Sequence, residues 1–175
     1  TTLARYYAKN ISKAKTVVEF DASTVNNLNE SYRKFADKLI NEDKLISEQE
    51  KVHFKYLLKI TKSVLDDTKI IDYIKKRLRY YSDWCLIYDG MENYSDIKEY
   101  VPHNEVLWGS GKIIITTRNK NLQHHELVDN FIEVKELENE EKLKLFLQFK
   151  GTEKFNTIEV EEFLTHIPPF PLDVS

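Results

Sequence analysis

Short apolar runs along the chain predict strands. The run 16–21 is rich in β-branched residues and 84–88 is apolar throughout, as expected of strands buried on both faces of a sheet. The run 112–117 contains three consecutive isoleucines and predicts another buried strand. A shorter run at 131–134 predicts a fourth. Because stretches with helical periodicity separate these runs, the pattern indicates strands that alternate with helices.

The segment after the first predicted strand has the clearest helical pattern. Ser23 or Thr24 can cap the helix that starts there. Apolar residues then recur at helical spacing and form one amphipathic face, which consists of Val25, Leu28, Tyr32, Phe35 and Leu39. Further helices are predicted at 1–9, within the polar stretch 41–65, and at 67–80, 94–100, 138–149 and 157–166.

The order of these elements predicts an α/β fold. Buried strands that alternate with helices are typical of a parallel sheet covered by helices on both faces. The last part of the chain contains only predicted helices, so we expect an α/β domain at 1–137 and the start of a separate helical subdomain at 138–175. The stretch 41–65 predicts an amphipathic helix packed on the first domain, with a partner-binding helix as the alternative.

Composition narrows the class of protein. The 175 residues are 41% hydrophobic, which allows a buried core, and the net charge of −3 gives no reason to expect a nucleic-acid partner. No apolar stretch approaches the ~18 residues of a membrane span, so no membrane association is predicted. Cys85 is the only cysteine and lies inside an apolar run, which predicts a buried thiol and favours the reducing cytoplasm. The five histidines lack the spacing of a zinc site.

Polar residues follow two of the predicted strands. Ligands of parallel α/β sheets bind beyond the carboxyl ends of the strands. Asp89 lies at one such end, and a carboxylate there can hold a hydrated Mg²⁺. Thr116, Thr117 and Arg118 lie at another, where an arginine can bind phosphate oxygens. Taken singly, Asp89 also fits a turn and Arg118 a solvated surface, but together they predict a nucleoside triphosphate site.

Several segments match the motifs of one family, in the same order. Thr1-Thr2-Leu3-Ala4 is similar to the residues that follow Gly-Lys in a Walker A loop, and 84–89 is similar to a Walker B strand. The segment 111–119 is similar to a sensor strand that ends in Thr-Thr-Arg. The segments 131–146 and 167–172 are similar to the lead into a helical ARC subdomain and to its Gly-Leu-Pro-Leu motif. Together they resemble the NB-ARC family of STAND signalling ATPases.

The resemblance implies a P-loop NTPase sheet that is truncated before its Walker A strand and loop, followed by the start of the ARC subdomain. It implies that ADP or ATP binds with Mg²⁺. Thr1 and Asp89 would hold the metal, Asp89 through water, and Thr2 would lie near the α-phosphate. Thr117 and Arg118 would contact the nucleotide, with Arg118 sensing the γ-phosphate. Pro171 would pack against adenine.

Two departures from the family pattern affect what we expect. Gly90 stands where the family often has a second acidic residue, and Glu92 is then the candidate for polarising water, so ATP hydrolysis would be slow or absent. The chain also begins inside a predicted helix, and we expect it to be a fragment. The family places the missing strand between the sensor strand and the next one, so this fragment alone should have exposed strand edges and poor solubility.

The function implied by the resemblance is an adenine-nucleotide switch in the cytoplasm. ADP would favour a closed state, and ATP an open state that self-associates, with protein partners bound through domains outside this chain. One alternative is a degenerate NB-ARC-fold scaffold, or protein-interaction domain, that no longer binds nucleotide. Another is a receiver-like phospho-acceptor domain using Asp89, Thr116 and Lys135, which the long stretch ahead of Asp89 disfavours.

Overall fold

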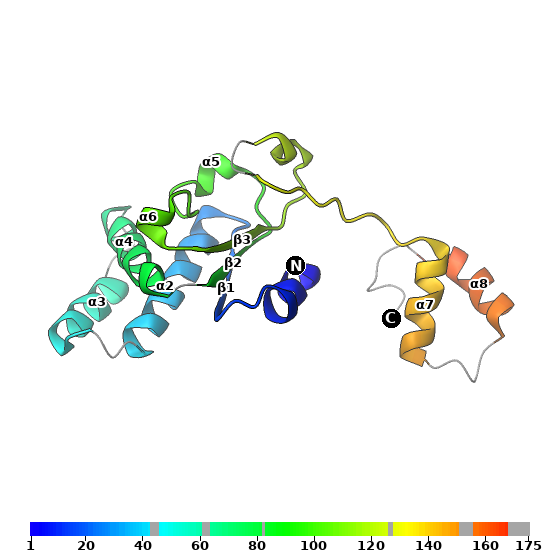
Figure 1. Cartoon of the computed structure of the whole chain (residues 1–175), viewed down its shortest axis with the longest axis horizontal. Helices are drawn as coiled ribbons and strands as arrows, with labels where there is room; N and C mark the ends of the chain where they lie inside the picture. The colour runs from blue at the N-terminus through cyan, green and yellow to red at the C-terminus, as the bar shows by residue number, and fades with distance from the viewer. Residues whose placement is uncertain (43–45, 61–63, 82, 126–127, 151–155, 168–175) are drawn as a thin grey trace. The chain divides into compact units, whose positions relative to one another are not determined.

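The computed structural model describes residues 1–42, 46–60, 64–81, 83–125, 128–150 and 156–167 (Figure 1). The chain divides into two compact units, 1–129 and 130–175. The first unit contains the sheet, and the second contains two of the described helices. Pro171 lies outside the described residues.

The sheet has three parallel strands in the order β1-β2-β3, which confirms the prediction of a parallel α/β fold. The strands are β1 (Thr16–Asp21), β2 (Trp84–Asp89) and β3 (Gly111–Ile115). In the register, Asp21 lies beside Asp89, and Tyr88 lies beside Ile115. The carboxyl ends of all three strands therefore meet at one edge. In the described part of the chain, no strand pairs with the outer edge of β3.

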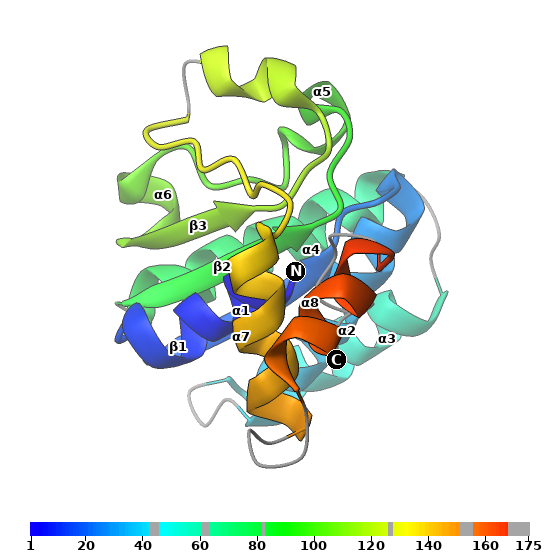
Figure 2. The same cartoon turned by 90° about the vertical axis from the view of Figure 1, so that its right-hand side faces the viewer.

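Helices cover both faces of the sheet. In Figure 1, α2 (Val25–Glu42), α3 (Glu48–Ile60) and α4 (Val64–Tyr80) lie on one side of the sheet. The helix α1 (Thr2–Tyr6), continued by the π-helical turn η1 (Tyr7–Ile11), lies on the other side (Figures 1 and 2). The Thr24 hydroxyl accepts a hydrogen bond from the Asn27 amide at 3.1 Å, so Thr24 caps α2 as predicted.

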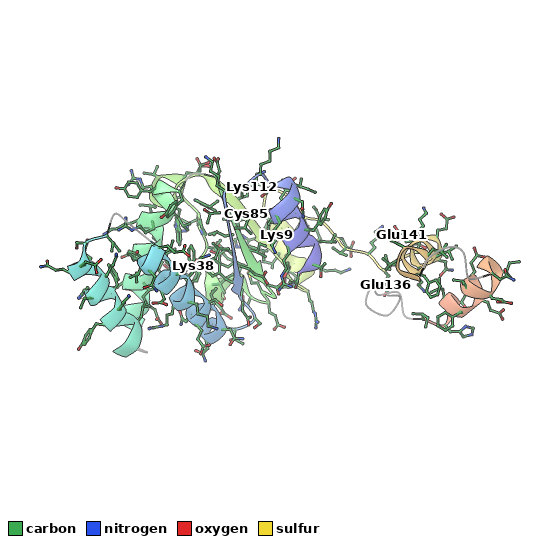
Figure 3. The ribbon with its side chains drawn as sticks, turned by 90° about the horizontal axis from the view of Figure 1, so that it is seen from below. Lys9, Lys38, Cys85, Lys112, Glu136 and Glu141 are labelled. Atoms are coloured by element: carbon green, nitrogen blue, oxygen red, sulfur yellow. The ribbon has the colours of Figure 1, made fainter. Side chains whose placement is uncertain are left out.

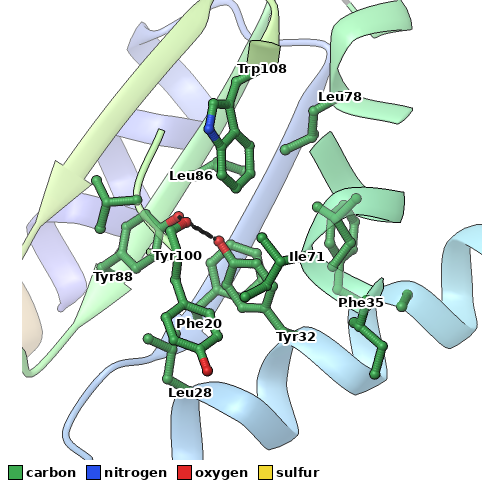
Figure 4. Packing of buried hydrophobic residues seen from close by; sticks show 14 of the residues in the cluster. Phe20, Leu28, Tyr32, Phe35, Ile71, Leu78, Leu86, Tyr88, Tyr100 and Trp108 are labelled. Carbon is green, nitrogen blue, oxygen red and sulfur yellow. Dashed lines mark hydrogen bonds between the residues drawn. The ribbon is translucent and has the colours of Figure 1, made fainter. Parts of the chain in front are cut away.

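The larger core lies between the sheet and α2 and α4 (Figure 4). Phe20, Leu86 and Tyr88 point from the strands into this core and are fully buried. The Tyr32 and Tyr88 hydroxyls lie 2.8 Å apart, and both donate to the carbonyl oxygen of Tyr100. This shared acceptor satisfies two phenols that would otherwise be costly to bury.

The opposite sheet face packs against α1. Cys85 and Ile87 are buried there beside Ala4 and Ala8, which confirms the prediction of a buried thiol. Burial raises the pKa of the Cys85 thiol. Cys85 and Lys112 are neighbours across β2 and β3 (Figure 3). Alternate residues of a strand face opposite sides of the sheet, so Asp89 shares the α1 side with Cys85 and Ile87.

Three short helical turns complete the first unit: α5 (Tyr94–Ile97), α6 (Glu105–Trp108) and the 3₁₀ turn η2 (Lys120–His124). The predicted helix 94–100 is thus shorter than expected. The turns α6 and η2 were not predicted, because a single turn shows no helical periodicity. Asn104 and Asn119 each accept a hydrogen bond from the amide two residues ahead, which begins these turns. None of the helices in the described ranges has both the length and the apolar character of a membrane span.

The predicted strand at 131–134 is wrong. These residues carry no regular secondary structure, and Ile132 and Val134 are 83% and 71% exposed. A strand exists only where a neighbour pairs with it, and the described residues offer this segment none.

The second unit contains α7 (Asn139–Lys150) and α8 (Thr157–Thr165), as predicted. Val160 and Leu164 are buried between the two helices. Lys142 is also buried, and its Nζ donates to the carbonyl oxygens of Leu164 and Ile167 at 3.3 and 3.0 Å. This lysine satisfies carbonyl groups at the end of α8, where a positive charge is favourable.

Candidate functional site

Asp89 is the last residue of β2, the central strand of the sheet. Its carbonyl oxygen accepts a hydrogen bond from the Ala22 amide at 2.8 Å, so the chain after β1 lies against the end of β2. Gly90 follows with a φ of 74°, a conformation that glycine adopts without strain. The chain therefore turns sharply after Asp89, and 26% of the Asp89 side chain remains accessible.

Two threonine hydroxyls meet at the Asp89 carboxylate. Thr1 Oγ1 donates to Asp89 Oδ1 at 2.5 Å, although the two residues are 88 positions apart in the chain. Thr116 Oγ1 donates to the same oxygen at 2.6 Å. The Thr1 side chain makes no capping hydrogen bond to α1, so its hydroxyl is turned to the carboxylate instead. The end of β2 thus joins α1 and the end of β3.

These contacts keep Asp89 ionised. Burial raises the pKa of the carboxyl group, but the hydrogen bonds from Thr1 and Thr116 favour the charged form and outweigh it. The charged amino terminus at Thr1 and then the guanidinium group of Arg5 add smaller attractions. The pKa of Asp89 therefore lies below its ordinary value, and the side chain is an anion at neutral pH.

Thr116 also fastens the loop that follows β2. Its Oγ1 accepts a hydrogen bond from the Gly90 amide at 2.9 Å, and its carbonyl oxygen accepts one from the Met91 amide at 2.9 Å. Thr116 thus has more contacts with the site than Thr117, the threonine that the sequence pattern favoured. The sequence feature that could have identified Thr116 is its position one residue after β3, which places it beside Asp89.

Among the described residues, the other predicted site residues do not hydrogen-bond to the Asp89 carboxylate. Thr117 Oγ1 accepts from the Asn119 amide at 2.9 Å, and the Asn119 amide group donates to the Glu92 carbonyl oxygen at 3.0 Å. These bonds join the loops after β2 and β3. The side chains of Arg118 and Glu92 are exposed, as is Thr2 at the start of α1.

A second carboxylate lies beside Asp89 and was not predicted. Asp21 ends β1 and is paired in register with Asp89. Its Oδ1 accepts from the Ser23 amide at 3.1 Å and from the Ser23 hydroxyl at 2.5 Å. Its Oδ2 accepts from the Asn27 side-chain amide at 3.2 Å. The sequence signal was an aspartate at the end of each of two predicted strands.

The donor set suits a hard cation that retains water. Hydroxyl and carboxylate oxygens are the ligands that Mg²⁺ prefers, and it commonly uses one or two carboxylates together with waters. Among the described residues, no group of three or more His, Cys, Asp or Glu side chains is arranged to hold a metal ion. A cation at this edge would therefore be held by Asp89, threonine hydroxyls and water.

Comparisons with known proteins do not identify the chain. It matches no protein-family model, and a search of curated proteins found no match.

Proposed function

We propose that this chain is the nucleotide-binding core of an NB-ARC-type switch that binds ADP or ATP with Mg²⁺. The observation that carries the proposal is the meeting of Thr1, Asp89 and Thr116 at the carboxyl edge of a parallel sheet. These residues come from three separate motifs on which the resemblance to the NB-ARC family rests. Their contact is what a shared nucleotide site requires, because its ligands must converge on one metal and one phosphate chain.

The chemistry of the contact supports a magnesium site. Asp89 is ionised and partly accessible, and it lies next to the Thr1 hydroxyl. In the proposed complex, Thr1 would bind Mg²⁺ directly and Asp89 would hold it through water. The metal would neutralise charge on the phosphates. The exposed Arg118, two residues after Thr116, would contact the γ-phosphate and distinguish ATP from ADP.

The strand arrangement is compatible with the proposal. The family places one further strand beside the sensor strand, followed by the strand that corresponds to 131–134. The outer edge of β3 carries no partner in the described residues, and the apolar segment 131–134 lies unpaired. A strand supplied from upstream of Thr1 would pair with both, because each side of a strand can bond one neighbour.

As a switch, the protein would respond to which nucleotide is bound. Self-association would follow if the ATP-bound state exposes a surface that the ADP-bound state covers, since a ligand shifts an equilibrium only by its difference in affinity for the two states. Turnover would be slow unless another carboxylate takes the place of the one that Gly90 lacks after Asp89.

The positive φ of Gly90 also favours a second candidate, a scaffold that has kept the fold and lost the nucleotide. An acidic residue would be strained at this position, so the backbone disfavours the usual catalytic carboxylate there. The scaffold would use the same domain to bind proteins.

The test uses the full-length protein purified without added nucleotide. Denaturing it and separating the supernatant by chromatography should release ADP or ATP, and Asp89→Ala or Arg118→Ala should reduce the amount. The matched control is Asp72→Asn, which removes a half-exposed carboxylate from α4, on the other side of the sheet from α1. An empty wild-type protein that shows no calorimetric binding of Mg·ADP or Mg·ATP would overturn the proposal and favour the scaffold.

A further inference from the structure

The ends of the three strands present a row of polar side chains on one face of the sheet. Glu19 of β1 accepts two hydrogen bonds from Arg5 of α1, at 2.7 and 2.5 Å, so Glu19 faces α1. Asp21, two residues later on the same strand, directs its Cβ to the same side, while its carboxylate bonds to Ser23 and to Asn27 at the start of α2. Asp89 and Thr116 also face that side, since Thr1 and Thr116 both bond to Asp89. Neighbouring strands are about 4.8 Å apart, so Asp21 lies directly beside Asp89.

The turn after β1 occupies the space next to Gly90. A Cβ atom at Gly90 would lie 3.6 Å from the Cβ of Ser23. The Ser23 hydroxyl bonds to Asp21, and the Asn27 side chain bonds to both the Ser23 hydroxyl, at 3.0 Å, and Asp21. Asp21 thus belongs to the turn that packs against Gly90, the position where the family often has its second acidic residue.

The hydrogen bonds of Asp21 leave room for one more donor. A carboxylate has about four lone-pair sites, two on each oxygen. Ser23 fills both sites of Oδ1 through its amide and hydroxyl, and Asn27 fills one site of Oδ2. The remaining site of Oδ2 can accept a hydrogen bond from a water molecule. Because three bonds fix the orientation of the carboxylate, little freedom is lost when a water binds there.

We propose that Asp21 orients and polarises the water that attacks the γ-phosphate of ATP, an inference that rests on the proposed nucleotide function. The water oxygen forms a bond to the γ-phosphorus, while the bond from that phosphorus to the β–γ bridging oxygen breaks and its electron pair leaves with ADP. The proton released by the water passes to Oδ2 of Asp21 and then to the phosphate product. Asp21 thereby supplies the carboxylate that Gly90 lacks.

Glu92 is the competing candidate. It lies two residues after Gly90, its side chain is exposed like that of Asp21, and its carbonyl oxygen is bonded to Asn119 in the loop beyond β3. The described structure places no donor on the Glu92 carboxylate comparable to those that hold Asp21. Asp21→Asn should therefore lower the rate more than Glu92→Gln, because it keeps the size of the side chain and removes its ability to accept the proton.

The experiment measures single-turnover hydrolysis of Mg·ATP by the full-length protein and binding of Mg·ADP by calorimetry. Asp21→Asn should lower the rate by about 100-fold or more, the range for loss of a general base, with the affinity for Mg·ADP changed less than twofold. The surface control Asp72→Asn should hydrolyse within about twofold of wild type, because its side chain lies on α4, on the other side of the sheet from α1. Glu92→Gln, which tests the competing candidate, should lower the rate less than Asp21→Asn does.

Each other result overturns the inference in an identifiable way. If Mg·ADP binds and Asp21→Asn hydrolyses ATP at the wild-type rate, Asp21 has no such role while the proposed function stands. The same holds if wild type binds but hydrolyses no faster than Asp89→Ala. If no nucleotide binds, both proposals fail. If Asp21→Asn does not fold, Asn27→Ala provides the test. This variant removes one hydrogen bond to the Asp21 carboxylate, so it should slow hydrolysis and leave the affinity for Mg·ADP intact. An unchanged rate would refute the role of Asp21.

Discussion

At the scale of single residues, the low pKa of Asp89 depends on two hydroxyl groups. Thr1 and Thr116 favour the ionised form, so the pKa in the folded state lies below that in the unfolded state. The stabilisation from these bonds is fully present above the ordinary aspartate pKa of about 3.9. It is lost as the pH falls through the lower pKa of the folded protein.

Thr116→Val should therefore destabilise the protein in a pH-dependent way. It removes one donor to Asp89 and the acceptor of the Gly90 amide, which should lower the free energy of unfolding by about 1–3 kcal/mol at pH 7. The loss should shrink near pH 3, because protonated Asp89 gains less from the hydroxyl. Denaturant unfolding at both pH values checks this. Thr117→Val is the matched control, and an equal, pH-dependent loss there would contradict the assignment.

At the scale of elements, the Tyr32–Tyr88–Tyr100 contact joins α2 to β2 directly behind Asp89. Tyr32→Phe leaves its ring packing on Phe20, at a centroid distance of 4.4 Å, and removes only the hydroxyl. Burial raises the pKa of Tyr32, so the phenol stays protonated and able to donate. We expect a loss of about 1–3 kcal/mol in thermal or denaturant unfolding, as for other buried hydrogen bonds. Tyr80→Phe, with a side chain 75% exposed, should cost less than about 0.5 kcal/mol.

The strands and helices also show how much of the fold could be predicted from the sequence. Strands β1, β2 and β3 were predicted because each has a β-branched or apolar run, and the long helices because their periodicity spans several turns. Burial was predicted correctly only for β2: β1 is mostly half-buried, and β3 is exposed at 111–113 and half-buried at 114–115. The segment 131–134 has an equally apolar pattern, yet strand formation depends on a neighbour that no local pattern specifies. Asp89 was identified as a strand-end carboxylate. Asp21 was missed, and the contact of Thr116 with Asp89 was not predicted, because register and facing decide which strand-end side chains meet, and both depend on how separate strands align.

At the scale of the whole molecule, the open edge of β3 bears on how the chain behaves in solution. An unpaired strand edge offers free amide and carbonyl groups to any other strand and favours association. The apolar, exposed residues Ile132 and Val134 add to this tendency. If the proposed family arrangement holds, a strand from upstream of Thr1 would occupy the edge and order 131–134 as its second neighbour.

In the proposed arrangement, residues 1–175 expressed alone should therefore associate at lower concentration than a longer chain that carries a strand able to pair with β3. Sedimentation velocity over a range of concentrations measures this, and hydrogen exchange should show slower exchange at 111–115 and 131–134 in the longer chain. A monomeric fragment with clean two-state unfolding would contradict the open edge as a source of association. Equal exchange in the two chains would instead show that β3 finds no partner upstream, and the P-loop arrangement would lose its structural support while the α/β fold itself remained.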